Sequence, residues 1–150
     1  MAWIYALVVS WIVFFILVRR GQKVEICIGA LIAITLQLMM DINAHVLGLY
    51  YIHGALLNVY GSPICFTLGP VLTMGIIFVQ HLPKHRWWQA AHIAVFSTLF
   101  FLFELLVQRI GNLEYIHWNH LGSFFVDVTV FMALSWAGAM FASKRGVNGA

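Results

Sequence analysis

Five apolar segments, each close to the length of a bilayer-spanning helix, limit the folds open to this chain more than any other feature. They cover roughly residues 2–18, 24–42, 63–81, 88–108 and 120–142. A helix needs about 20 mostly apolar residues to cross the hydrocarbon core of a bilayer. In a chain of 150 residues, these segments leave no room for a separate soluble domain. We therefore expect one all-α domain, an integral membrane bundle of five transmembrane helices.

The composition supports a membrane protein with the lipid bilayer as its main partner. Hydrophobic residues make up 63% of the chain and charged residues only 9%, whereas about a quarter of a soluble domain is charged. The net charge of +3 comes from Lys and Arg between the apolar segments. These charges report membrane topology, so we expect no nucleic-acid surface.

The basic residues also predict an orientation, because Lys and Arg are retained on the cytoplasmic side of a membrane. Seven of the eight fall on one side if the N-terminus is outside: Arg19, Arg20, Lys23, Lys84, Arg86, Lys144 and Arg145. Only Arg109 falls on the other side. We expect a multi-pass protein of the cell membrane, with its N-terminus outside and its C-terminus in the cytoplasm.

Three local features refine this bundle. Pro70 lies inside the third apolar segment and is expected to kink that helix and free a carbonyl. Residues 43–62 are aromatic but too polar for another span, which favours an outer-surface cap or a partly re-entrant segment. Small residues near the end of the fifth segment favour close helix packing or a homo-oligomer interface. They are Gly138, Ala139, Ala142 and Ser143.

Polar residues within the spans are spaced to share helix faces. Gln37, Asp41 and His45 are four residues apart, which makes a polar stripe that climbs to the outer surface. Two further stripes occur on the fourth and fifth segments. They consist of Ser97, Glu104 and Gln108, and of His120 and Asp127.

Three spans thus each carry one carboxylate in the outer half of the bilayer, namely Asp41, Glu104 and Asp127. A charge that faces lipid is costly, so we expect all three to point into the bundle and to converge there. We expect at least one of them to be protonated at neutral pH, unless Arg109, a histidine or a metal ion neutralises it. The alternative is that each acid only joins helices through hydrogen bonds, which average below about 1 kcal/mol in membranes.

The last outer loop, "LEYIHWNH", holds the other candidate site. Glu114, His117 and His120 have the spacing of metal ligands on one helical face, although a wet loop also favours such residues. We expect His117 to turn inward over the mouth of the pocket and Trp118 to lie at the interface. A divalent metal is thus a candidate cofactor. His92, alone on the inner half of the fourth span, is expected to be a buried hydrogen-bonding residue and not a haem ligand.

Two stretches of the C-terminal half resemble a known family. They are "YGSPICFTLGP" and the segment from Glu104 through "LLVQRIGNLEYIHWNHLGSFF". This combination is similar to a family of uncharacterised small multi-pass membrane proteins found mainly in spore-forming Firmicutes. Its members have a transmembrane Glu followed by a Tyr-Ile-His-Trp block, here Glu104 and Tyr115, Ile116, His117 and Trp118. The resemblance implies a multi-helix membrane fold and brings no established activity.

Three classes of function fit these patterns. The first is a transport or sensor protein whose outward acidic and histidine-containing pocket binds a cation, a proton or a small polar ligand. The second is an enzyme of the outer membrane face that acts on lipid or cell-envelope substrates, with Glu104 or Glu114 as general base. The third is an accessory subunit of a membrane complex, in which the polar groups only join helices.

Overall fold

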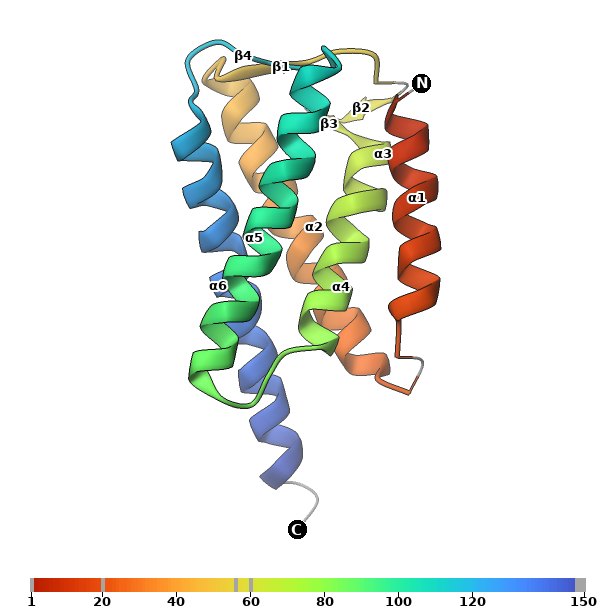
Figure 1. The fold of residues 1–150 in the computed structure, drawn as a ribbon, viewed down its shortest axis with the longest axis vertical. Helices are drawn as coiled ribbons and strands as arrows, with labels where there is room; N and C mark the ends of the chain where they lie inside the picture. The colour runs from red at the N-terminus through yellow and green to blue at the C-terminus, as the bar shows by residue number, and fades with distance from the viewer. Residues whose placement is uncertain (1, 20, 56, 60, 148–150) are drawn as a thin grey trace.

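The computed structural model describes residues 2–19, 21–55, 57–59 and 61–147, with side chains up to Phe141 (Figure 1). The helices are α1 (Ala2–Leu17), α2 (Lys23–Val46), α3 (Ile64–Phe66), the π-helical turn η1 (Thr67–Val71), α4 (Leu72–Gln80), α5 (Arg86–Arg109) and α6 (His120–Val147). Because α3, η1 and α4 follow one another without a break, the described part of the chain forms five helical segments. They run alternately up and down, which brings the two ends of the chain to opposite ends of the bundle.

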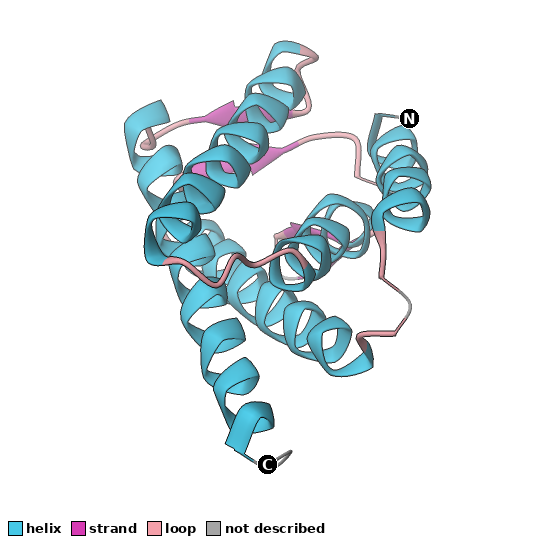
Figure 2. Cartoon of the chain, turned by 60° about the horizontal axis from the view of Figure 1, so that its bottom comes forward, coloured by secondary structure: helices cyan, strands magenta, loops and turns pink. Residues whose placement is uncertain are grey.

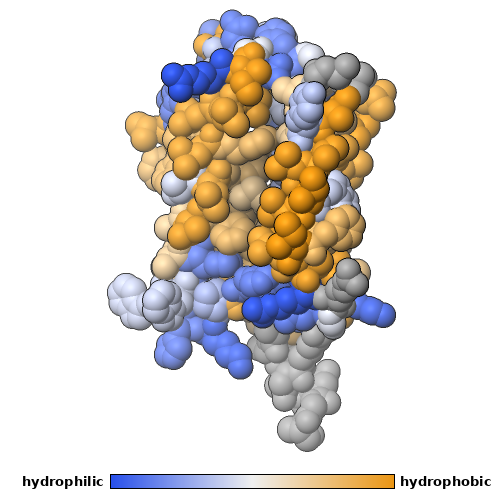
Figure 3. Space-filling model, turned by 45° about the vertical axis from the view of Figure 1, so that its right-hand side comes forward, coloured by the Kyte–Doolittle hydropathy of each residue, from blue (hydrophilic) through white to orange (hydrophobic). Residues whose placement is uncertain are grey.

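Three of these segments are long and apolar enough to cross a membrane. They are Lys23–Val46, Arg86–Arg109 and His120–Phe141, while Ala2–Leu17 and Ile64–Gln80 are shorter apolar helices. On the face shown in Figure 3, hydrophobic residues form a broad band between two more polar ends. Trp87 and Trp88 are 87% and 69% exposed where α5 begins at one of these ends, as is typical of aromatic residues at a membrane surface.

The structure is not purely helical, contrary to the expectation of an all-α chain. Four short strands pair into two antiparallel sheets, β1 (Tyr50–Ile52) with β4 (Leu113–Tyr115), and β2 (Asn58–Val59) with β3 (Ser62–Pro63). The structure adds detail to residues 43–62, for which the sequence favours an outer-surface cap or a partly re-entrant segment; that interpretation stays a prediction. The first residues of this segment complete α2, and its later residues supply β1, β2 and the start of β3.

We call β1 and β4 together the lid, because they cross one end of the bundle side by side (Figure 2). Each lid strand comes after a helix that ends at a glycine in the left-handed conformation. Gly48 follows α2 with a φ of 60°, and Gly111 follows α5 with a φ of 81°. A left-handed glycine closes the last helical turn and redirects the chain at little steric cost. The same local device thus directs both strands across the bundle.

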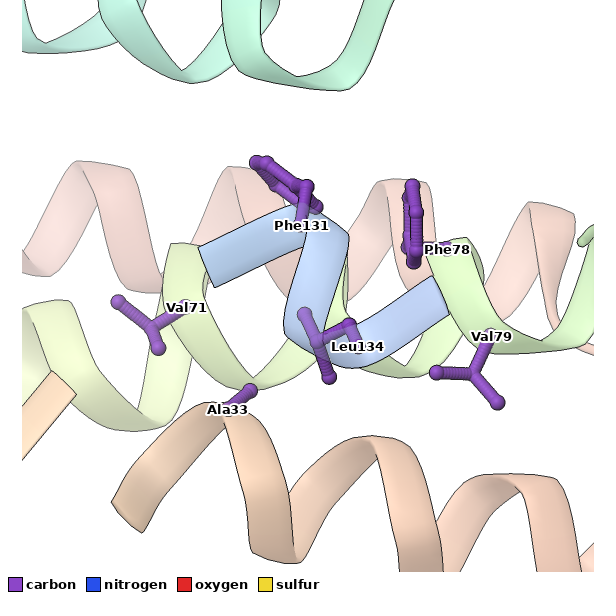
Figure 4. Close-up of a cluster of buried hydrophobic side chains, with 6 residues drawn as sticks. All are labelled: Ala33, Val71, Phe78, Val79, Phe131 and Leu134. Carbon is purple, nitrogen blue, oxygen red and sulfur yellow. The ribbon is translucent and has the colours of Figure 1, made fainter. Parts of the chain in front are cut away.

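Helices α2 and α4 pack closely against each other within the bundle. A side chain at Gly29 would meet the backbone of Gly75 and Ile76 at 2.8 Å, and one at Gly75 would collide with Ala33. Beside this contact lies a core cluster of Ala33, Val71, Phe78, Val79, Phe131 and Leu134, drawn from α2, η1, α4 and α6 (Figure 4). Small residues allow two helices to approach closely where lipid offers no hydrophobic driving force.

Both ends of the bundle are fastened by polar contacts. At the lid end, the indole of Trp3 on α1 donates to the carbonyl of His53 at 2.8 Å. At the opposite end, the side-chain amide of Gln80 accepts from the backbone N–H of Arg19 and donates to its carbonyl, both at 3.0 Å. Pro70 lies in the single π-helical turn η1, and the kink expected there stays a prediction.

Candidate functional site

A cavity of about 300 Å³ lies beneath the lid and is lined by residues from all five helical segments. Its polar lining includes Gln37, Asp41, Asn43, Tyr50, Glu104, Ser123 and Asp127. The rest of the wall is mostly aliphatic and aromatic, and the described lining contains no Lys, Arg or His. Three carboxylates therefore share one apolar cavity with no basic side chain among its described residues.

Glu104, on α5, is the most fully hydrogen-bonded of the three carboxylates. The hydroxyl of Tyr115, in β4, donates to its Oε1 at 2.6 Å. The hydroxyl of Ser123, on α6, lies 2.7 Å from Oε1 and 2.5 Å from Oε2. Glu104 thus connects the lid with two helices, which is the role expected of a buried acid that only joins elements through hydrogen bonds.

Asp41, on α2, is only 2% exposed, and only one of its two carboxylate oxygens has a hydrogen-bond partner among the described residues. Its Oδ1 accepts a hydrogen bond from the hydroxyl of Tyr50 at 2.5 Å. Its Oδ2 is buried and has no hydrogen-bond partner among the described residues. A buried polar atom without a partner is rare in native proteins and calls for an explanation, such as an ion or ligand.

Asp127, on α6, is 7% exposed and makes no hydrogen bond within the described part of the chain. Its neighbours on the same helix face continue the lining of the cavity. Ser123 and Val130 lie four residues before and three residues after it, respectively. Leaving a buried carboxylate unpaired is costly, so Asp127 is the strongest candidate for contact with a ligand.

The lid supplies the hydroxyl groups that hold two of these carboxylates. Tyr50 and Tyr115 are register partners across β1 and β4, so their side chains lie on the same face of the sheet. Burial raises the pKa of the Tyr50 hydroxyl far above its usual value, and the negative charge of Asp41 raises it further. Burial and the hydrogen bond to Glu104 likewise raise the pKa of Tyr115. Both hydroxyls therefore remain donors at physiological pH.

A second, outer pocket of about 310 Å³ adjoins the first. Its lining residues are Asp41, His45, Tyr50, Tyr51, Ile52, Asn58 and Gly61. Asp41, Tyr50 and Ile52 line both pockets. The hydrogen bond between Asp41 and Tyr50 thus lies at the boundary between the outer pocket and the cavity.

The structure gathers only some of the predicted site residues at the cavity. Gln37, Asp41, Glu104 and Asp127 line it, and His45 lines the outer pocket. The amide oxygen Oε1 of Gln108 accepts a hydrogen bond from Nε2 of His120 at 2.9 Å, outside the cavity lining. Arg109 is exposed and forms no ion pair with a described residue, so it does not neutralise the carboxylates.

The structure does not place His117 over the mouth of the cavity, as the sequence predicts. His117 is exposed and its ring has no hydrogen bond to another described residue. Its backbone N–H donates to the carbonyl of Leu49, the residue before β1, at 3.1 Å. Trp118 lines the cavity, and its expected place at the membrane interface stays a prediction.

The structure does not assemble the expected metal site from Glu114, His117 and His120. Glu114 lies in a strand, so the helical spacing on which the prediction depended does not apply. Its carboxylate instead forms an exposed ion pair with His53 at 3.2 Å. Across the described residues, no group of three or more His, Cys, Asp or Glu side chains could hold a metal ion.

Two other sequence predictions concern residues away from the cavity. The Nε2 atom of His92 lies 3.1 Å from the carbonyl oxygen of Phe78, in hydrogen-bonding contact. Gly138 is buried against α4 and its following loop, where an added side chain would meet Leu82 at 3.2 Å and Val79 at 3.3 Å. Ala139 is exposed, and the side chains of Ala142 and Ser143 lie outside the described ones. The oligomer interface stays a prediction.

Sequence reasoning missed the two lid tyrosines, Ser123 and Trp118. The signal for the lid was present, because "YYI" and "LEY" are short runs rich in strand-forming residues that come soon after Gly48 and Gly111. The spacing of Glu and His around the second run imitates a helix face. The pairing of these runs, which are far apart in the chain, could not be read from either one alone.

These features define a class, a mostly helical bundle with membrane-length helices and a carboxylate-lined cavity beneath a two-stranded lid. Comparison with protein-family models, with curated proteins and with solved structures yields no match for this chain. The resemblance to the Firmicutes membrane family therefore stays a prediction.

Proposed function

We propose that this chain is a five-span protein of the cell membrane that binds a small cationic ligand, or protons, in the cavity beneath its lid. The N-terminus and the lid lie outside, and the binding is of the transport or sensor type. The observation that carries this proposal is the pair of buried carboxylates, Asp41 and Asp127. Each has an Oδ2 atom without a hydrogen-bond partner among the described residues, and both line one cavity.

Electrostatics favours a positively charged ligand. An ionised carboxylate in an apolar site is stabilised by an opposite charge, and the described lining offers none of its own. The single hydrogen bond of Asp41 and the absence of any for Asp127 within the described chain leave acceptor positions free for a donor. A cation with N–H or O–H donors would supply both the positive charge and the hydrogen bonds to these carboxylates.

The arrangement of basic residues supports the orientation. Arg19, Lys23, Lys84 and Arg86 lie at the end of the bundle opposite the lid, in or beside the connections that follow α1 and α4. Arg109 is the basic residue at the lid end among those described. Cytoplasmic retention of basic loops then directs the lid outward.

The test is ligand binding by the purified full-length protein in detergent. A panel of ammonium, guanidinium and alkali cations would be screened by thermal shift, each as its chloride salt. We expect at least one cation to raise the melting temperature of the native protein, and Asp127→Asn to remove that shift.

Glu114→Gln serves as the matched control, since that carboxylate is exposed on the outer face of the lid. We expect it to leave the shift unchanged. Should no cation in the panel shift the native protein, or should Asp127→Asn retain the full shift, the proposed binding of a cationic ligand in this cavity would be wrong.

A further inference from the structure

The cavity contains one carboxylate that no other described residue engages. Asp127 lines the cavity, is 7% exposed, and makes no hydrogen bond within the described chain. By contrast, Asp41 accepts a hydrogen bond from Tyr50. Glu104 accepts hydrogen bonds from Tyr115 and Ser123. A ligand would therefore gain most at Asp127, because it would satisfy a group that otherwise bears the full cost of desolvation.

The wall of the cavity is rich in aromatic rings. Trp3, Tyr50, Phe66, Phe100, Phe103 and Trp118 all line the cavity. Phe66 and Phe103 stack with ring planes 6° apart. Aromatic faces attract a cation through their quadrupole and also cover apolar ligand surface.

Trp118 is held in place by α6, which makes its ring a fixed part of this wall. An added side chain at Gly122 would lie 3.4 Å from the indole, so the glycine leaves room for the ring against the helix. The side chain of Asn119 accepts from the backbone N–H of Gly122 at 2.6 Å and fixes the first turn. Trp118 and Asp127 are thus positioned by the same helix.

The site offers fewer ligands than a metal ion requires. Calcium takes six to eight oxygen ligands and magnesium six in near-ideal geometry. The described residues contain no cluster of three or more candidate ligands. A volume of about 300 Å³ is at the lower end of the range for small organic molecules, roughly 300–1,000 Å³.

From these observations we infer that the cavity binds an organic ammonium ion with an aromatic or apolar body. The ammonium donates a hydrogen bond to Asp127, and the body packs against the aromatic wall that includes Trp118. This inference rests on the proposed function and narrows it, because it selects an organic cation over a metal ion or a bare proton.

The experiment measures binding to the full-length protein in detergent by isothermal titration calorimetry. The probe is phenethylammonium. Ethylammonium retains the charge without the ring, and 2-phenylethanol retains the ring without the charge. We expect phenethylammonium to bind at least about tenfold more tightly than either comparison compound, since each lacks one of the two contacts. Calcium and magnesium chlorides complete the set.

Matched variants test the two contacts separately. Asp127→Asn should weaken phenethylammonium binding at least about tenfold, whereas Glu114→Gln should not change it. Trp118→Leu should weaken the same binding several-fold, whereas Trp88→Leu, at the far end of α5, should leave it unchanged. Circular dichroism of each variant verifies that the helices remain folded.

The outcomes separate the two proposals. Equal binding of ethylammonium and phenethylammonium, or tighter binding of a metal ion, would overturn the ligand class and leave the proposed function standing. Equal binding of 2-phenylethanol and phenethylammonium would show that charge is not recognised. The absence of binding by every cation would overturn both this inference and the proposed binding of a cationic ligand, and these comparisons need only the native protein.

Discussion

Tyr50 and Tyr115 lie opposite each other in the lid and donate their hydroxyls to carboxylates on different helices, Asp41 on α2 and Glu104 on α5. Each tyrosine lies on the strand that comes after the helix bearing its own acceptor. The pairing of the two strands therefore places the Tyr50–Asp41 and Tyr115–Glu104 hydrogen bonds side by side beneath the lid. Anything that separates the strands must disturb both carboxylates.

Removal of these hydroxyls is expected to loosen the lid. In Tyr50→Phe the buried carboxylate of Asp41 loses a donor, and in Tyr115→Phe the part-buried carboxylate of Glu104 loses one. Each change should lower the free energy of unfolding by about 1–3 kcal/mol. Tyr51→Phe is the matched control, because Tyr51 is exposed on the opposite face of β1. Thermal unfolding in detergent measures the difference, and equal melting temperatures for all three variants would contradict the assigned contacts.

The same tyrosines predict a loss of stability at alkaline pH. The pKa of both hydroxyls is higher in the folded chain than the ordinary value of about 10. The stability that they contribute is therefore complete below about pH 10 and is lost as the pH rises toward their folded-state pKa. Melting temperatures between pH 8 and pH 11 should fall less steeply in the Tyr50→Phe, Tyr115→Phe double variant than in the native protein. Parallel curves would refute this coupling.

Two glutamates ten residues apart should respond differently to the same substitution. Glu104→Gln replaces an acceptor of Tyr115 and Ser123 with an amide, and should cost about 1–3 kcal/mol of stability. Glu114→Gln breaks only an exposed ion pair with His53, which contributes at most about 1 kcal/mol. The measurement is thermal unfolding of both variants. A larger loss from the second than from the first would reverse our assignment.

Close approach of α2 and α4 makes Gly29 sensitive to a single methyl group. In Gly29→Ala the new carbon would meet the backbone of Gly75 and Ile76 at 2.8 Å. Overpacking of this kind costs about 1–3 kcal/mol. Gly21→Ala is the control, because an added carbon there has no described neighbour within 4 Å. We expect a lowered melting temperature for the first variant alone, and a stabilised Gly29→Ala protein would disprove the close contact.

The membrane orientation is open to a direct test with topology reporters. Fusions after Lys23 and after Arg145 should report the cytoplasm, and a fusion after Glu114 should report the outside, because basic loops are retained within the cell. Alkaline phosphatase and a cytoplasmic fluorescent reporter give opposite readings at each position. An external reading after Lys23 or Arg145 would require a different span count or orientation.

The helices are predictable from the sequence because their causes are local. Long apolar runs separated by Lys and Arg indicate the helical segments near their observed bounds, and the four-residue spacing of Gln37, Asp41 and His45 falls on one helix because α2 extends to Val46. The spacing of Ser97, Glu104 and Gln108 likewise falls on one helix, α5. Periodicity within one element needs only the residues of that element.

The errors concern residues whose environment depends on distant parts of the chain. The spacing of Glu114 from His117 and His120 predicts a helix, yet β4 forms there by pairing with β1. Trp118, whose neighbour His117 donates to the carbonyl of Leu49, lines a cavity to which all five helical segments contribute. Both contacts join residues far apart in the chain, so neither can be read from one local stretch of sequence.

By itself, the sequence determined that this chain forms membrane-length apolar helices with a carboxylate on each of three of them, because hydropathy and helical spacing are properties of contiguous residues. Only the tertiary structure decided that Asp41 and Glu104 receive tyrosine donors from a lid while Asp127 receives none among the described residues. The physical reason is that a hydrogen bond depends on the distance between two groups, and here the pairing of two strands far apart in the chain sets that distance.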